Sequence, residues 1–170
     1  WSAAWDMLRD AEISATDFID IALAGLPGED DIATVTIIAN QLITAVELYS
    51  APNKRDSSRL KVGNAYEQML RAAAAGSDHQ LQFARNFTSF ASSAEHNDLI
   101  KELLDAKLPG LKVDADLRWT FVIALAERGL MDKAALSAEL LKDNTLTGSL
   151  SHATALAALP TEQAKSEVWK

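Results

Sequence analysis

The sequence predicts an all-α fold of about ten helices, arranged as an irregular HEAT- or armadillo-like superhelix of antiparallel helical hairpins. The apolar residues are mostly Ala, Leu and Ile, with few clusters of β-branched residues, which favours helix over strand. These residues recur at helical spacing, and a capping residue precedes most of the apolar stretches. Pairs of helices repeat at roughly 35–45 residues, the size of a hairpin repeat. A compact orthogonal bundle is the alternative arrangement.

Five helices are expected in the first half of the chain. Ser14 is a good N-cap for the second helix, with Asp17 placed to complete a capping box. The third helix has the most regular apolar pattern, and three acidic residues stand at its start, where the helix dipole favours negative charge. Residues 50–56 are predicted to form a loop, and Ser77 is expected to cap the fifth helix. The expected helices cover residues 1–10, 14–26, 30–49, 57–75 and 77–90.

The second half is organised around residues 113–148, which we interpret as two helices and a tight corner. Asp114 and Asp132 are expected to cap these helices, and Gly129 is expected to adopt the left-handed conformation that ends the first one. A corner this short predicts that the two helices are antiparallel neighbours. Ser93 is predicted to cap the preceding helix, Thr147 or a neighbour to start the following one, and Thr161 to cap a last helix that ends near Trp169.

Composition limits the classes of function. The net charge of −8 and the pI of about 4.8 fit poorly with nucleic acid or an anionic membrane, since both attract a basic face. The absence of cysteine excludes disulfides and thiolate chemistry, and it is compatible with a cytoplasmic protein. No uninterrupted apolar run approaches the ~18 residues of a membrane span. A chain of 170 residues suits a single domain, 1–170.

The sequence contains no recognisable catalytic constellation. A zinc peptidase requires two histidines on one helical face with a glutamate base between them. His79, His96 and His152 are too far apart for that pattern, so we expect surface or capping roles for them. No GxSxG or phosphate-binding glycine loop is present. We therefore predict no catalytic residue, no metal site and no cofactor within these residues.

Arg118 is the polar residue for which a functional role is considered. It falls early in a helix whose following positions are apolar, and Asp114 lies four residues before it. One interpretation is an ion pair between Arg118 and Asp114. The other is an arginine that binds a peptide carboxylate through its planar guanidinium.

Several stretches resemble the C-terminal helical domain of M1-family zinc aminopeptidases, of the aminopeptidase N type found in actinobacteria. These stretches keep the family's order along nearly the whole chain: AAWDMLRDAEISATDFIDIAL, GEDDIATVTIIANQL, VDADLRW, GLMDKAALSAELLKDNTLTG and LPTEQAKSEVWK. The resemblance implies that the chain is a fragment of a longer polypeptide that removes N-terminal residues from peptides. In such a parent, a HExxH…E zinc site and a GxMEN motif would lie upstream of Trp1.

The resemblance also implies a role for the fragment itself. It would be a non-catalytic domain that covers the catalytic cleft and restricts access of peptides. Its partners would be the upstream catalytic domain and the peptide substrate, which Arg118 could contact at the far end. The alternative function is a free-standing helical-repeat scaffold for protein–protein interaction. A start codon near Trp1 would favour the scaffold, and a HExxH several hundred residues upstream would favour the aminopeptidase.

Overall fold

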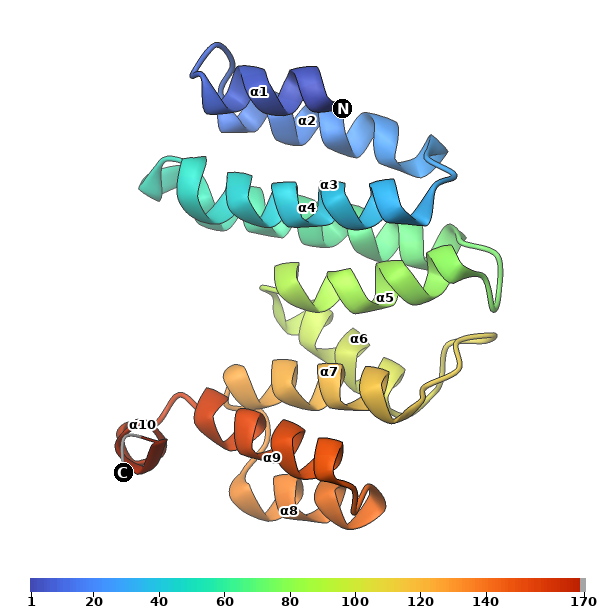
Figure 1. Cartoon of the computed structure of the whole chain (residues 1–170), viewed down its shortest axis with the longest axis vertical. Helices are drawn as coiled ribbons and strands as arrows, with labels where there is room; N and C mark the ends of the chain where they lie inside the picture. Colours follow the sequence, from blue (N-terminus) through green and yellow to red (C-terminus); the bar gives the residue numbers. More distant parts are fainter. Residues whose placement is uncertain (169–170) are drawn as a thin grey trace. The chain divides into compact units, whose positions relative to one another are not determined.

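The computed structural model describes residues 1–168, which form ten α-helices and no strand (Figure 1). A short 3₁₀ turn and a π-helical segment extend two of the helices. The all-α prediction is confirmed, and the superhelical arrangement stays a prediction. The elements are α1 (Ser2–Arg9), α2 (Ala15–Gly25), η1 (Leu26–Gly28), α3 (Ile32–Thr44), η2 (Ala45–Tyr49), α4 (Pro52–Ala72), α5 (Asp78–Phe90), α6 (Ala94–Leu104), α7 (Ala115–Glu127), α8 (Lys133–Lys142), α9 (Leu146–Ala158) and α10 (Glu162–Val168).

The predicted N-caps are present, because a cap depends only on residues within one helical turn. Ser14 and Asp17 form a reciprocal capping box at α2, in which the Asp17 N–H donates to Ser14 Oγ at 3.1 Å. Asp114 and Asp132 each accept a backbone N–H at 2.8 Å, at the starts of α7 and α8. Ser77, Ser93 and Thr161 cap α5, α6 and α10 in the same way. The predicted end of the last helix near Trp169 lies outside the described residues.

One predicted boundary is wrong. Residues 50–56 are not a loop, since α4 begins at Pro52. Proline suits the first turn of a helix, because its missing N–H has no intrahelical partner there and its φ is already helical. The start of α9 agrees with the prediction, because the helix begins at Leu146, next to Thr147; Thr145 is the cap and accepts the Gly148 N–H at 3.0 Å.

The corner after α7 has the predicted local geometry, but the helix that packs beside α7 is not the predicted one. Gly129 has a φ of +70°, and the Leu130 N–H donates to the Leu125 carbonyl at 2.9 Å, as in a Schellman motif. However, α7 packs chiefly along α9, which also contacts α8; Figure 1 shows α9 between the other two. The prediction that α7 and α8 pack as antiparallel neighbours is therefore wrong, because α9 takes the place beside α7.

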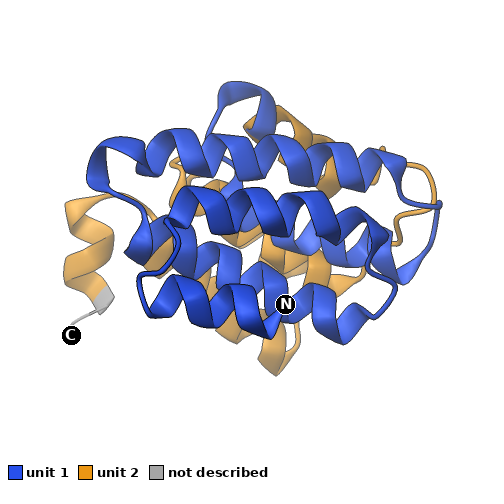
Figure 2. Cartoon of the chain, turned by 90° about the horizontal axis from the view of Figure 1, so that it is seen from above, with its two compact units in different colours: residues 1–96 blue, residues 97–170 orange. Residues whose placement is uncertain are grey.

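The chain divides into two compact units, Trp1–His96 and Asn97–Lys170, which Figure 2 shows in different colours. Unit 1 contains α1 to α5, with α4 packed along α5, and α2 and α3 against these helices. Its core is rich in large side chains that are at most 4% exposed, among them Phe18, Tyr66, Phe83, Phe87 and Phe90. Tyr66 stacks on Phe90 with ring centroids 5.2 Å apart and meets the edge of Phe83.

One core cluster of unit 2 joins α7 to the helices that follow it. The cluster comprises Trp119, Val122 and Ala126 of α7, Leu136 of α8, Ala155 of α9, and Leu159 and Ala164 near the end of the described chain. Alanine dominates the last part of this set. Met131, Leu140 and Leu156 are only partly buried against this cluster.

One helical stretch meets the length and hydropathy criterion for a membrane span. The stretch Ile32–Tyr49, formed by α3 and η2, has a mean hydropathy of 1.4 over 18 residues. The core helix of a soluble protein meets the same criterion. Here Val35, Ile38 and Leu42 are fully buried in unit 1, whereas Ile37 is 56% exposed.

Candidate functional site

Arg118 lies in a polar cluster between α7 and α8. Its Nε donates to Glu139 Oε2 at 2.6 Å, and its Nη1 donates to the Leu104 carbonyl at 3.2 Å. The expected pairing with Asp114 is wrong, because that carboxylate accepts the Leu117 N–H as the cap of α7. The Arg118 side chain is 29% exposed, and a role in binding substrate stays a prediction.

Glu139 is the buried partner in this cluster. Only 8% of the residue is exposed, and its Oε1 accepts a hydrogen bond from Lys142 Nζ at 2.7 Å. Burial alone would raise the pKa of this carboxyl, but the hydrogen bonds from Arg118 and Lys142 outweigh burial and hold the pKa below its ordinary value. Glu139 is therefore an ionised, paired carboxylate that joins α8 to α7, and its position explains why Arg118 is fixed.

A second polar link joins α7 to the turn between α8 and α9. Trp119 Nε1 donates to Asp143 Oδ2 at 2.9 Å, and Thr145 Oγ1 donates to the other oxygen of that carboxylate at 2.8 Å. Gly148 allows this turn to close, since a Cβ there would lie 2.1 Å from the Asp143 carbonyl oxygen. The turn is thus held from the α7 side by one indole hydrogen bond.

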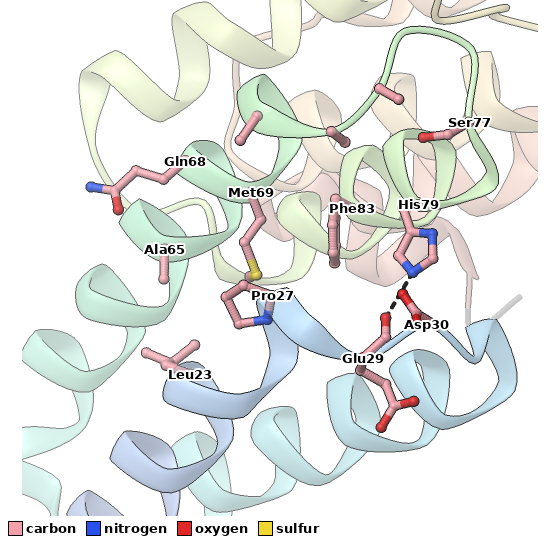
Figure 3. A pocket seen from close by; sticks show the side chains of 13 residues that line it. Leu23, Pro27, Glu29, Asp30, Ala65, Gln68, Met69, Ser77, His79 and Phe83 are labelled. Carbon is pink, nitrogen blue, oxygen red and sulfur yellow. Dashed lines mark hydrogen bonds between the residues drawn. The ribbon is translucent and has the colours of Figure 1, made fainter.

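A separate cavity of about 500 Å³ lies inside unit 1, where η1 meets the end of α4 and the start of α5. Met69 and Phe83 are its most buried apolar residues, and Leu23 and Pro27 line it from the α2–η1 side (Figure 3). His79 lies at the rim, with Nε2 2.8 Å from the Glu29 carbonyl oxygen. Glu29, Asp30, Gln68 and Ser77 also line the cavity, which has the size of a small-molecule site. Sequence analysis missed it, because its residues come from three separate segments.

The three histidines have different environments. His96 is only 1% exposed, so the predicted surface role is wrong for it. The Ser92 N–H donates to its Nδ1 at 3.2 Å, which leaves the proton on Nε2 to donate to Asn64 Oδ1 at 2.9 Å. A Cβ at Gly63 would lie 2.6 Å from the imidazole, so the close fit of α4 requires glycine. His96 is a satisfied core histidine that fixes the start of α6.

His79 and His152 are both half-buried. The ring of His152 meets Trp119 edge-on, with centroids 6.4 Å apart. In the part of the chain that the structure describes, no group of three or more His, Asp or Glu side chains could hold a metal ion. The polar clusters around Arg118 and Trp119 join helices through hydrogen bonds and charge pairing.

The comparisons with known proteins agree with this arrangement. The family model described as "ERAP1-like C-terminal domain" matches residues 1–170. The chain is also similar to aminopeptidase N of Streptomyces lividans, with 42% identity over 172 aligned residues. That alignment covers 100% of this chain and 20% of the relative, so the chain spans about a fifth of the relative's length. The chain therefore belongs to the ERAP1-like C-terminal domain family, and the resemblance to the C-terminal domain of an aminopeptidase N is confirmed.

Proposed function

We propose that residues 1–170 are the non-catalytic C-terminal domain of a zinc aminopeptidase that removes N-terminal residues from peptides. The observation that supports this most is the 42% identity to an aminopeptidase N along the whole chain. The zinc would be held by a HExxH…E motif, which the 170 residues do not contain. In the parent, that motif would lie upstream of Trp1, and the zinc would polarise the scissile carbonyl.

The domain would cover the catalytic cleft and restrict access to short or unfolded peptides. Restriction of this kind needs a cover that holds its shape, and the aromatic core and the capping box of unit 1 support that requirement. Because one family model spans residues 1–170, both units are proposed to belong to one domain, built as a HEAT-like superhelix. The parent is proposed to be cytoplasmic, in keeping with the absence of cysteine from these residues.

The test uses the full-length parent and a set of substrates that share one N-terminal residue. We expect hydrolysis of an aminoacyl reporter, its loss on chelation and its return with zinc. Peptides should be cleaved, whereas a folded protein with the same N-terminus should resist cleavage. Cleavage of the folded protein at the rate of a short peptide would contradict the covering role, and a parent with no aminopeptidase activity would contradict the whole proposal.

Arg118 is proposed to contact the distal end of the peptide. Its guanidinium is held by Glu139 and retains an exposed edge, which supports a fixed cation for a carboxylate. In the parent, Arg118→Ala should raise KM for peptides with a free C-terminus more than for their amidated forms. Arg59→Ala removes a comparable ion-paired arginine from unit 1 and is the matched control. Equal effects of Arg118→Ala on both kinds of peptide would mean that Arg118 links α7 to α8 and does not bind the peptide C-terminus.

The alternative is a free-standing scaffold that binds a partner protein. The length of the reading frame separates the two, because only the aminopeptidase requires several hundred residues before Trp1. A reading frame that starts near Trp1 and lacks HExxH would favour the scaffold.

A further inference from the structure

The helix ends that flank the turn between α8 and α9 carry three leucines that are exposed to solvent. Leu141, on the last turn of α8, is 85% exposed; Leu146 and Leu150, one turn apart on α9, are 79% and 63% exposed. Single exposed leucines are common on protein surfaces, but three within ten residues make a concentrated apolar surface. We name Leu141, Leu146 and Leu150 the leucine surface.

The leucine surface contributes nothing to the core of unit 2. The residues that bury α8 and α9 against α7 are Leu136 and Ala155, with Leu140 and Leu156 partly buried beside them. The three leucines are absent from that cluster, and each is at least 63% exposed. Burying it would therefore gain hydrophobic free energy without disturbing the packing of this unit.

The turn that presents these leucines is held rigidly from within. Its Asp143 carboxylate accepts hydrogen bonds from Trp119 Nε1 and from Thr145 Oγ1, and Thr145 in turn caps α9. Gly148 fits against the Asp143 backbone too closely for any side chain. A surface that is already ordered loses little conformational entropy on binding, which is the property expected of a docking site.

We propose that the leucine surface docks on the part of the parent polypeptide that lies outside residues 1–170. The inference rests on the proposed function, which makes this chain one domain of a larger enzyme. The choice of occupant rests on length: the Streptomyces relative matches along this whole chain, yet the chain spans only 20% of that relative. A covering domain also needs a fixed attachment to the rest of its enzyme, and an ordered apolar surface with polar neighbours supplies one.

The test measures cysteine labelling in the full-length parent. Single variants Leu146→Cys and Leu150→Cys are treated with a maleimide, and the labelled peptides are quantified by mass spectrometry, because residues 1–170 contain no other cysteine. The control is Asp56→Cys in unit 1, where the native side chain is 96% exposed. Docking predicts that both leucine variants react about tenfold or more slowly in the native parent than after unfolding, while Asp56→Cys reacts at similar rates in both.

Four outcomes overturn the proposal or support it. Slow labelling that is independent of protein concentration and of peptide supports docking within the parent. Labelling as fast as that of Asp56→Cys overturns it. Protection that disappears on dilution points to a second copy, and protection that requires peptide points to substrate; both overturn it. If the leucine variants do not fold, Ser149→Cys on the first turn of α9 reports the same protection. The aminopeptidase assay on the unmodified parent tests the proposed function separately.

Discussion

The packing inside unit 1 differs from the packing of the last three helices of unit 2. Unit 1 buries several aromatic rings around Tyr66, whereas the described residues after α7 bury only Leu136, Ala155, Leu159 and Ala164 among apolar side chains. In that region the hydrogen bonds of Arg118 and Trp119 add to the apolar packing. The difference teaches that helices of similar length can be fixed by apolar packing in one place and by apolar packing with buried polar links in another.

The largest expected effect is in the aromatic core. Phe87 is completely buried and meets His96 edge-on at 5.2 Å, so Phe87→Ala leaves a cavity and should lower the free energy of unfolding by about 4 kcal/mol. Leu48→Ala, at a position that is 76% exposed, is the control and should change stability little. Denaturant unfolding followed by circular dichroism measures both. A loss below about 2 kcal/mol for Phe87→Ala would mean that this core relaxes easily.

Gly148→Ala should break the polar attachment in unit 2. The added Cβ would lie 2.1 Å from the Asp143 carbonyl oxygen and 2.7 Å from its carboxylate, so the start of α9 must shift. We expect a loss of about 3 kcal/mol, together with a change in Trp119 fluorescence as the bond to Asp143 is disturbed. Gly28→Ala is the control, because a Cβ there meets nothing within 4 Å. An unchanged stability in Gly148→Ala would show that the turn is less tightly closed.

The Arg118–Glu139 pair should make stability depend on pH on the acid side. The folded pKa of Glu139 is lowered from 4.5, so its ionised form stabilises the fold above about pH 4.5, and this contribution is lost as the pH falls through the lower folded value. Glu139→Gln should therefore lose about 1.5 kcal/mol at pH 7 and much less at pH 3. Thermal melts at both pH values measure the difference, with the exposed Glu127→Gln as control. A loss that is equal at both pH values would show that the charge of Glu139 is unimportant.

The smallest expected effect is a gain at the end of α6. Ala106 has a φ of +55°, and its N–H donates to the Leu103 carbonyl, as at a Schellman C-cap. Ala106→Gly should relieve the strain of the left-handed conformation and stabilise unit 2 by about 0.5–1 kcal/mol. Ala11→Gly is the equivalent change in unit 1, where φ is +60°. Melting temperatures compare the two variants, and a loss of stability in both would contradict the assignment of strain.

Sequence analysis predicted the features that short segments determine. The helix count, the caps at Ser14, Asp114 and Asp132, and the left-handed Gly129 depend on neighbouring residues and were all correct. Features that depend on distant residues were missed. The partner of Arg118 lies 21 positions away, and nothing in the sequence marks Glu139 as buried.

The position of α9 and the burial of His96 were also missed because they depend on distant residues. The packing of α7 along α9 depends on which of three amphipathic helices fits beside it, and burial of His96 depends on the close approach allowed by Gly63. The cavity near Met69 requires three segments to meet. The family resemblance was correct because it used residue order along the whole chain, which is independent of tertiary contacts.

Native-state hydrogen exchange of the 170 residues tests the difference between the two regions most directly. If the helices after α7 depend on polar links, amides of α8 and α9 should open with a lower free energy than those of α4 and α5. The Trp119→Phe variant, which removes the bond to Asp143, should lower that opening energy further and leave α4 and α5 unchanged. Equal protection of both regions, or an equal response of both to Trp119→Phe, would contradict the account.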